Sequence, residues 1–308
     1  MRFLNSMTLL KSFLLTCVVT TSIVVAQENE PLKPLKPVLF SAMGCGPYTP
    51  EAEVALAKFM ALENEDPTSS FIVHCGDIVT GKVKDWPESQ YEKVAGLLMK
   101  ENAIPTFIVP GDNEWNDQEN PDKAWGFWDK HFMGFHEKWK LPESFGKVAR
   151  QTVRPENFAF VLDGVLLLGI NKVGGMVHDT EEWEMRLNQD VAWISEHFTK
   201  HKADVHSAVI FAQAAAFSKK FGDFQAQLAK IAVPFEKPIL YLHADGHKWT
   251  VELGKWAENI TRVQLDVVNA KFPLIQVQVT GNPAEPFIYD RRLENPKWKL
   301  REAITPPQ

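Results

Sequence analysis

The chain has 308 residues, of which 45% are apolar and 23% are charged, the balance of an ordinary soluble globular protein with one large domain or two small ones. A formal net charge of −6 gives a surface that repels phosphate backbones, so we expect no nucleic-acid binding. The charge does not exclude a small anionic substrate that a bound metal holds.

The first 26 residues have the pattern of a secretory signal peptide. Arg2 and Lys11 precede an apolar run over residues 12–26, which ends in the small-residue cleavage pattern Val24-Val25-Ala26. A retained membrane anchor is the weaker alternative, because the run is shorter than the roughly 20 residues of a spanning helix. We therefore predict that the signal peptide is cleaved, that the protein is secreted or periplasmic, and that it has no stable membrane insertion afterwards.

The cysteines give less information. A lipoprotein signal at Cys17 is a second alternative for the N-terminus, although Thr16 fits the lipobox poorly. Once the signal is removed the chain keeps only Cys45 and Cys75, too few for a disulfide-dense scaffold. An exported protein can oxidise two thiols that lie close together, so a bond between them stays open at this point.

Strands and helices alternate in the first part of the mature chain. Residues 27–37 form a proline-rich linker. The apolar pattern then predicts strands at 38–40, 71–73 and 106–109 and helices at 51–62 and 89–100. This alternation predicts a parallel sheet in an α/β layered fold.

The second part begins with an aromatic segment, residues 115–140, which we expect to be helical and to form either a lid beside the site or an ordinary buried helical pair. A hairpin turned by Asp163-Gly164 follows at 158–170. The remaining predictions are helices at 181–198 and 221–232 and strands at 208–211, 239–242, 248–253, 260–267 and 274–279. Because no composition break divides these elements, we predict one domain at 38–292 and a tail at 293–308.

Four of the predicted strands lead into polar, glycine-containing turns. These turns are Gly44-Cys45-Gly46, Gly76-Asp77, Gly111-Asp112-Asn113-Glu114 and His243-Ala244-Asp245-Gly246-His247. Ligands of α/β sheets bind beyond the carboxyl ends of the strands, so the turns should converge at one rim. Carboxylates, an amide, imidazoles and a thiol could together bind a divalent metal, although each turn alone is more typical of an ordinary turn or helix cap.

The order of these turns resembles that of the calcineurin-like metallophosphoesterases. That family has five blocks in fixed order, each at a strand end: Asp-x-His, Gly-Asp, Gly-Asn-His-(Asp/Glu), a lone His, and Gly-His-x-His. The chain has HCGDIVTG at the second block, VPGDNEW at the third, VIFAQ at the fourth and LYLHADGHKW at the fifth, and the resemblance covers about residues 38–250. It implies a four-layer α/β/β/α sandwich and hydrolysis of small-molecule phosphoesters with one or two divalent metal ions, Mn, Zn or Fe.

The resemblance implies roles for individual residues. Asp77 matches the catalytic carboxylate that bridges the two metals, and Asn113 matches the amide ligand of the second metal. His247 matches the last histidine of the fifth block, a ligand of the first metal. Asp245 falls where that block has its first histidine, and a carboxylate can replace imidazole as a ligand.

Four further positions depart from the family pattern. Cys45 falls on the aspartate of the first block and Pro47 on its histidine. Gln213 falls on the lone histidine of the fourth block, where it would be a weaker, neutral ligand. Glu114 falls where the family has the histidine that protonates the leaving group, and it could be a catalytic proton donor if its pKa were raised. A thiolate at Cys45 suits zinc better than manganese or magnesium.

Two functions follow from these matches and departures. The first is an exported metal-dependent phosphoester hydrolase of the calcineurin-like type, with activity weak or lost. The alternative is a non-catalytic pseudoenzyme that uses the same fold for binding or structure.

Overall fold

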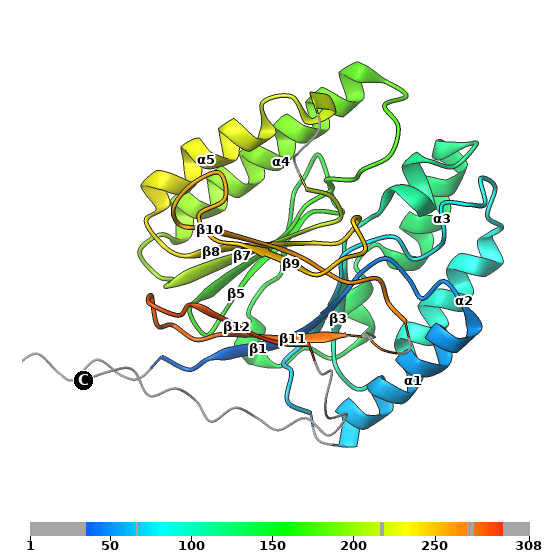
Figure 1. Cartoon of the computed structure of the whole chain (residues 1–308), viewed down its shortest axis with the longest axis horizontal. Helices are drawn as coiled ribbons and strands as arrows, with labels where there is room; N and C mark the ends of the chain where they lie inside the picture. Colours follow the sequence, from blue (N-terminus) through cyan, green and yellow to red (C-terminus); the bar gives the residue numbers. More distant parts are fainter. Residues whose placement is uncertain are drawn as a thin grey trace, which may run out of the picture. The chain divides into compact units, whose positions relative to one another are not determined.

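The computed structural model describes residues 35–65, 67–100, 102–215, 219–269, 271 and 274–291. The predicted signal peptide (1–26) and tail (293–308) lie outside these residues. The described residues form two β-sheets with helices on their outer faces (Figure 1).

The first sheet has five strands in the order β12-β11-β1-β2-β3. The strands are β1 (Val38–Met43), β2 (Ile72–His74), β3 (Thr106–Ile108), β11 (Ile275–Val279) and β12 (Phe287–Asp290). β1, β2 and β3 are parallel and are connected through α1 (Pro50–Glu65) and α2 (Glu88–Met99). Their carboxyl ends therefore lie at one edge of the sheet, as the alternating pattern predicted.

The second sheet has seven strands in the order β4-β5-β6-β7-β8-β10-β9. The strands are β4 (Ala149–Arg150), β5 (Phe158–Leu162), β6 (Val165–Gly169), β7 (Ser207–Ala212), β8 (Ile239–His243), β9 (Thr250–Glu252) and β10 (Ile260–Gln264). β6, β7 and β8 are parallel and are joined through α4 (Thr180–His201) and α5 (Phe224–Phe235). The N-termini of both helices therefore lie at the carboxyl ends of these strands.

Three buried apolar clusters separate four layers. One lies between the sheets and includes Phe40 and Phe71 from the first sheet and Phe211 and Leu240 from the second. The other two lie on the outer faces of the sheets, one beneath α4 and α5 and the other beneath α1, α2 and α3 (Pro121–Phe132). This arrangement is the predicted α/β/β/α sandwich, in which helices cover the apolar outer face of each sheet (Figure 1).

Most predicted elements are present, with differences at their ends. The hairpin of β5 and β6 turns at Asp163 and Gly164, whose φ angles of 45° and 78° suit the predicted two-residue turn. β4 and β12 were not predicted. The segment after β3 forms a short π-helix, η1 (Asp112–Asn116), and 3-10 turns lie at η2 (Phe135–Lys138), η3 (Glu143–Phe145) and η4 (Lys219–Phe221).

The aromatic segment fits the buried alternative better than the lid. Trp128, Phe132 and Phe135 are each 1% exposed and pack with residues of α1 and α2. Their rings form a continuous series of contacts, beginning with the stacking of Trp125 on Trp128 at 5.1 Å between centroids. The aromatic side chains of this segment therefore pack mainly into the core.

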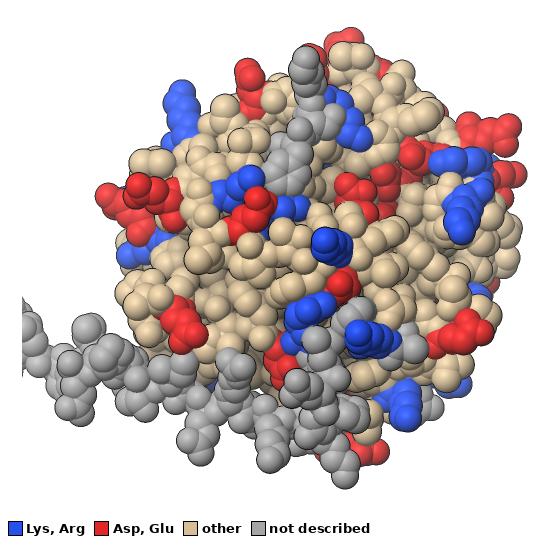
Figure 2. Space-filling model, in the orientation of Figure 1, with Lys and Arg blue, Asp and Glu red and all other residues tan. Residues whose placement is uncertain are grey.

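The visible surface carries charges of both signs. Figure 2 shows Lys and Arg side chains scattered among Asp and Glu side chains on this face. Among the described helices, none is both long enough and apolar enough to cross a membrane.

A buried carboxyl group ties α4 to the second sheet. Asp190 is fully buried, and its Oδ1 accepts a 2.8 Å hydrogen bond from the amide of Asn157. Burial raises the pKa of Asp190 to about 7, and the bond from Asn157 opposes this rise. The folded protein therefore holds a proton here at pH values where the unfolded chain has released it.

The protonation of Asp190 should make the free energy of unfolding depend on pH. Between about pH 4 and pH 7 the folded state binds more protons at Asp190 than the unfolded state, so its contribution to stability falls as the pH rises. Relative to Asp190→Asn, the wild type should lose about 3 kcal/mol of unfolding free energy between pH 4.5 and 7.5 in urea titrations. The exposed Asp204→Asn variant is the control and should follow the wild type; parallel curves for wild type and Asp190→Asn would contradict the prediction.

Candidate metal centre

Four of the predicted site residues have an unusual backbone conformation. Cys45, Asp77, Asp245 and His247 have φ angles of 57°, 61°, 65° and 58°. Only three other non-glycine residues in the described ranges have positive φ. This left-handed conformation costs free energy for a side chain with a Cβ and tends to occur at functional sites. The chain therefore keeps a costly backbone geometry at the strand ends where the sequence predicts the site.

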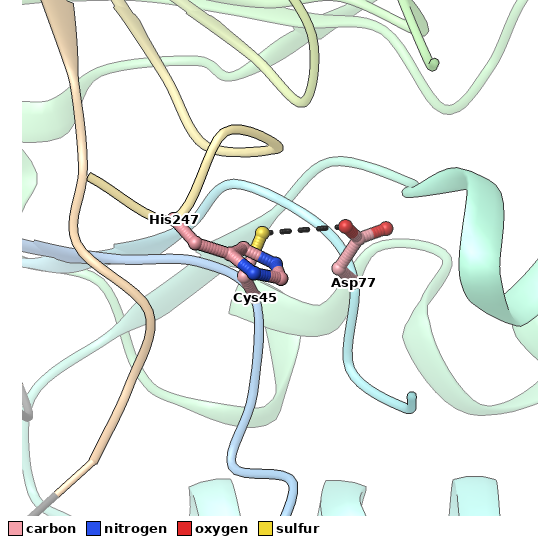
Figure 3. A group of neighbouring side chains, drawn as sticks. All are labelled: Cys45, Asp77 and His247. Carbon is pink, nitrogen blue, oxygen red and sulfur yellow. Dashed lines mark hydrogen bonds between the residues drawn. The ribbon is translucent and has the colours of Figure 1, made fainter. Parts of the chain in front are cut away.

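Cys45, Asp77 and His247 come together from three strand ends (Figure 3). Each residue offers one potential ligand atom, and the three atoms lie within 4.8 Å of one another. They are the Cys45 sulfur, an Asp77 carboxylate oxygen and a His247 ring nitrogen. The Cys45 thiol is 3.3 Å from Asp77 Oδ2, and both residues are buried, whereas His247 is exposed. A thiolate, a carboxylate and an imidazole are all ligand types that divalent metals accept, so these three residues could hold one cation.

The thiol of Cys45 is protonated when no cation is bound. Burial, followed by the nearby charge of Asp77, raises its pKa well above the ordinary value. A bound cation reverses this preference, because metals bind the thiolate and release its proton. Cys75 lies on the neighbouring strand end, yet both cysteines are free, and the Cys75 thiol faces the carbonyl of Leu242 at 4.0 Å.

Gln213 has a different arrangement from the predicted ligand. Its amide oxygen accepts a 2.6 Å hydrogen bond from the backbone N–H of Gly174, which fixes the orientation of the amide. Its nitrogen donates to Asp77 Oδ2 at 3.0 Å and to Asp112 Oδ1 at 3.1 Å. A metal would need the oxygen, so this geometry favours a role in holding the two carboxyl groups over the predicted ligand role.

Asp112 is a site residue that the sequence analysis missed. It is 7% exposed, and burial together with Asp77 raises its pKa well above the ordinary value. A signal was present in the sequence, because Gly111-Asp112-Asn113-Glu114 also fits Gly-Asn-His-(Asp/Glu) one residue earlier than the alignment used above. In that register Asp112 takes the place of the amide ligand that was assigned to Asn113.

Asn113 lies at the edge of the same group of residues. Its backbone N–H donates to Asp77 Oδ1 at 3.3 Å, and its side-chain amide donates to the hydroxyl of Tyr48, also at 3.3 Å. The ring of Tyr48 in turn packs edge-on against His247 with centroids 6.0 Å apart. Tyr48 is therefore a second residue of the site that the sequence did not indicate.

Glu114 braces the backbone of the site. Its carboxylate is fully buried and accepts hydrogen bonds from the N–H groups of Asp77, Ile78 and Gly111 at 3.1, 3.1 and 2.6 Å. Burial raises the pKa of Glu114 to about 8, as the predicted proton donor requires. Both oxygens, however, face backbone amides, so the geometry favours a positioning role for this residue.

The turn after β8 contributes Asp245 and His247 but not His243. The backbone N–H of Asp245 donates to the sulfur of Cys45 at 3.1 Å. Its carboxylate lies beside Gly174, where a Cβ would come within 3.5 Å of both oxygens and 2.8 Å of Asp112. Both ring nitrogens of His243 are hydrogen-bonded, one to Arg262 and the other to the carbonyl of Ala244, so neither is available as a metal ligand.

Comparison with protein families matches residues 50–248 to the calcineurin-like phosphoesterases. The chain belongs to the calcineurin-like phosphoesterase family. The matched segment contains four of the five blocks and begins after Cys45, so it supports the fold and the later blocks rather than the altered first one.

Solved structures show the same fold at low sequence identity. GAP50 of Plasmodium, the anchor in the inner membrane complex, is 11% identical with a TM-score of 0.53, over 88% of this chain and 87% of that one. The 5'-nucleotidase from Candida albicans SC5314 is 12% identical with a TM-score of 0.53, over 84% of this chain but only 53% of that longer one. None of the curated proteins compared with the chain matches it. At these identities the structural likeness shows the calcineurin-like fold alone.

Proposed function

We propose that this calcineurin-like phosphoesterase is an exported, metal-dependent hydrolase of small phosphoesters, with activity weakened by its altered site. The observation that carries the proposal is the meeting of Cys45, Asp77 and His247, whose ligand atoms lie within 4.8 Å of one another at the carboxyl edge of the sheets. Sulfur, carboxylate and imidazole favour zinc over manganese or magnesium. A bound divalent cation would supply Lewis acidity and a water molecule of lowered pKa.

The surrounding residues hold this centre in shape. Gln213 donates to Asp77 and Asp112 and so keeps both carboxyl groups at the site. The carboxylate of Glu114 accepts hydrogen bonds from the N–H groups of Asp77 and Ile78 and so holds the turn after β2 in place. These contacts fix the ligands before a cation or substrate arrives, which is how a catalytic site avoids reorganisation during the reaction.

Two polar groups beside the ligands are suited to bind the substrate. The amide of Asn113 and the hydroxyl of Tyr48 are hydrogen-bonded to each other next to exposed His247. Both can donate to a phosphoryl oxygen, and neither carries a charge that would repel it. We assign them to orientation of the phosphoryl group.

The same contacts give the non-catalytic alternative its support. Asp77 already receives hydrogen bonds from Cys45, Gln213 and the backbone of Asn113. Its carboxylate is therefore satisfied without a cation, and burial followed by the charge of Glu114 raises its pKa to about 7. A protein that uses this fold only to bind a partner would tolerate a site whose carboxylate is satisfied by internal hydrogen bonds.

Metal content and hydrolysis measured on one sample separate the two functions. If export removes residues 1–26, the mature protein should begin near Gln27, and this form is purified, analysed for metals and assayed with p-nitrophenyl phosphate and bis-p-nitrophenyl phosphate. We expect about one zinc per chain and slow hydrolysis, and Asp77→Asn should lower metal affinity by at least about a hundredfold and remove activity.

Asp163→Asn is the matched control, because Asp163 also has positive φ but lies in the β5–β6 turn. It should keep metal and activity. A wild-type protein without metal affinity and without hydrolysis would leave only the non-catalytic alternative.

A further inference from the structure

A cavity lies between the N-terminal parts of α4 and α5. It has a volume of about 500 Å³, within the range of small-molecule sites. Its floor consists of buried apolar side chains, and its rim is polar. The floor includes Trp183, Leu187, Phe221 and Phe224, and the rim includes Glu184, Asn188 and Gln227.

The cavity and the metal centre share one edge of the second sheet. α4 follows β6 and α5 follows β7, so both helices begin at the carboxyl ends of these strands. Gln213 and the turn that carries Asp245 and His247 follow β7 and β8 at the same edge. Ligands of α/β sheets bind in crevices of this kind.

The loop after β6 runs from the carboxylates of the metal centre to the lining of the cavity. Gly174 lies beside the carboxylates of Asp112 and Asp245, which a Cβ at this position would meet, and Val177 lines the cavity. Three residues of extended chain span at most roughly 10–11 Å. Between them the carbonyl of Gly175 accepts a 2.5 Å hydrogen bond from Lys220, which holds the loop against the rim.

Hydrogen bonds and ring contacts join the walls of the cavity. The indole N–H of Trp183 donates to the carbonyl of Lys220 at 2.7 Å, which ties α4 to the segment before α5. The rings of Trp183 and Phe221 lie 6.0 Å apart at 27°. Across the rim, Gln227 donates to Asn188 at 3.2 Å. An aromatic floor under amide and carboxylate groups suits a flat apolar group with polar atoms at its edge.

We propose that this cavity binds the leaving group of the substrate, and that the substrates are phosphoesters whose leaving group carries an aromatic ring. This inference rests on the proposed function, because the phosphoryl group must lie at the metal centre. It adds a substrate class that the metal ligands do not specify.

Binding of two phosphonates tests the inference without turnover, because a carbon–phosphorus bond is not hydrolysed by a phosphoesterase. The probes are butylphosphonate and 4-phenylbutylphosphonate, measured by calorimetry on the zinc-loaded protein. We expect the phenyl group to strengthen binding roughly tenfold. Asn188→Trp, which fills the cavity from the rim, should bring the ratio of the two affinities close to one and leave butylphosphonate binding unchanged.

Two further variants keep the test decisive. Gln227→Trp fills the cavity from α5 and should reproduce the effect if Asn188→Trp folds poorly. Glu196→Trp lies on an exposed position of the same helix α4 and should behave as wild type.

The outcomes separate the two proposals. A ratio near one in the wild type, or an unchanged ratio in both filled variants, overturns the cavity assignment alone. Failure of butylphosphonate to bind the zinc-loaded protein overturns the proposed function, and the leaving-group assignment with it.

Discussion

Replacing Arg186 by methionine is expected to lower the free energy of unfolding by about 3 kcal/mol, because several buried contacts depend on its guanidinium group. The side chain is fully buried, and the guanidinium carbon lies 5.0 Å from the ring of Trp115 and 4.6 Å from that of Trp183. It donates to the carbonyl of Asn171 at 3.2 Å and pairs with Glu182 at 3.0 Å. Methionine fills similar space but leaves the Asn171 carbonyl without this donor.

The same change should also weaken the metal centre. Trp115 belongs to η1 and directly follows Glu114, the carboxylate that holds the backbone of Asp77. Loss of the guanidinium from one face of Trp115 should loosen this turn and lower zinc affinity by roughly tenfold, the size expected for a residue that supports a ligand indirectly.

Urea unfolding and zinc titration at a temperature where all variants are folded provide the measurements. Arg186→Lys keeps the charge without the planar group and should fall between wild type and Arg186→Met. Lys200→Met, on the exposed side of α4, should change stability by no more than about 0.5 kcal/mol. An Arg186→Met protein as stable as this control would show that the two tryptophans hold their positions without the arginine.

The strands could be predicted because their apolar residues follow simple rules. β1, β6, β7 and β8 are almost fully buried runs, and runs of this kind between turns indicate interior strands. Asp77 follows β2 of the first sheet and His247 follows the β8 end of the second. Their positions at strand ends could be predicted, whereas their meeting also depends on the packing of one sheet against the other. β4 has only two residues and gives no periodic signal.

The orientation of single side chains could not be predicted. The motif Gly111-Asp112-Asn113-Glu114 contained the register that places Asp112 in the site, but the π-helical turn that orients its side chain has no sequence signal. The direction of the Gln213 amide depends on the N–H of Gly174, which is 39 positions away in the chain. The buried contacts of Glu114 likewise depend on two different strand ends. These details decide which residues can bind a metal, and they arise from tertiary packing.

Cys45→Asp should change the metal preference of the site and is the sharpest test of whether the enzyme is weakened or lost. Oxygen in place of sulfur should raise manganese affinity and lower zinc affinity, each by at least about tenfold. The backbone accepts the change, because Cys45 has a φ of 57° and aspartate tolerates this conformation better than most residues. The N–H of Asp245, now 3.1 Å from the sulfur, can donate to the new carboxylate.

Without a cation the same variant should be less stable than wild type. The new carboxylate would replace a thiol that lies 3.3 Å from Asp77, and two buried carboxylates at this distance repel each other. Manganese should relieve this repulsion, so the melting temperature should be low in chelator and rise with added manganese. Cys45→Ser removes the thiolate without adding charge and should show neither the loss nor the recovery.

Hydrolysis by the Cys45→Asp variant distinguishes a weakened enzyme from a lost one. If the centre is a weakened enzyme, phosphoester cleavage by Cys45→Asp with manganese should exceed that of the wild type. Adding Asp77→Asn should abolish the gain, because the central carboxylate of the cluster would be neutral. A Cys45→Asp protein that melts lower in chelator and in manganese alike, and binds no additional metal, would have acquired only an unpaired buried charge. That result would mean that the hydrogen bonds among Cys45, Asp77 and Gln213 have replaced the metal, and that the fold now serves a binding or structural role.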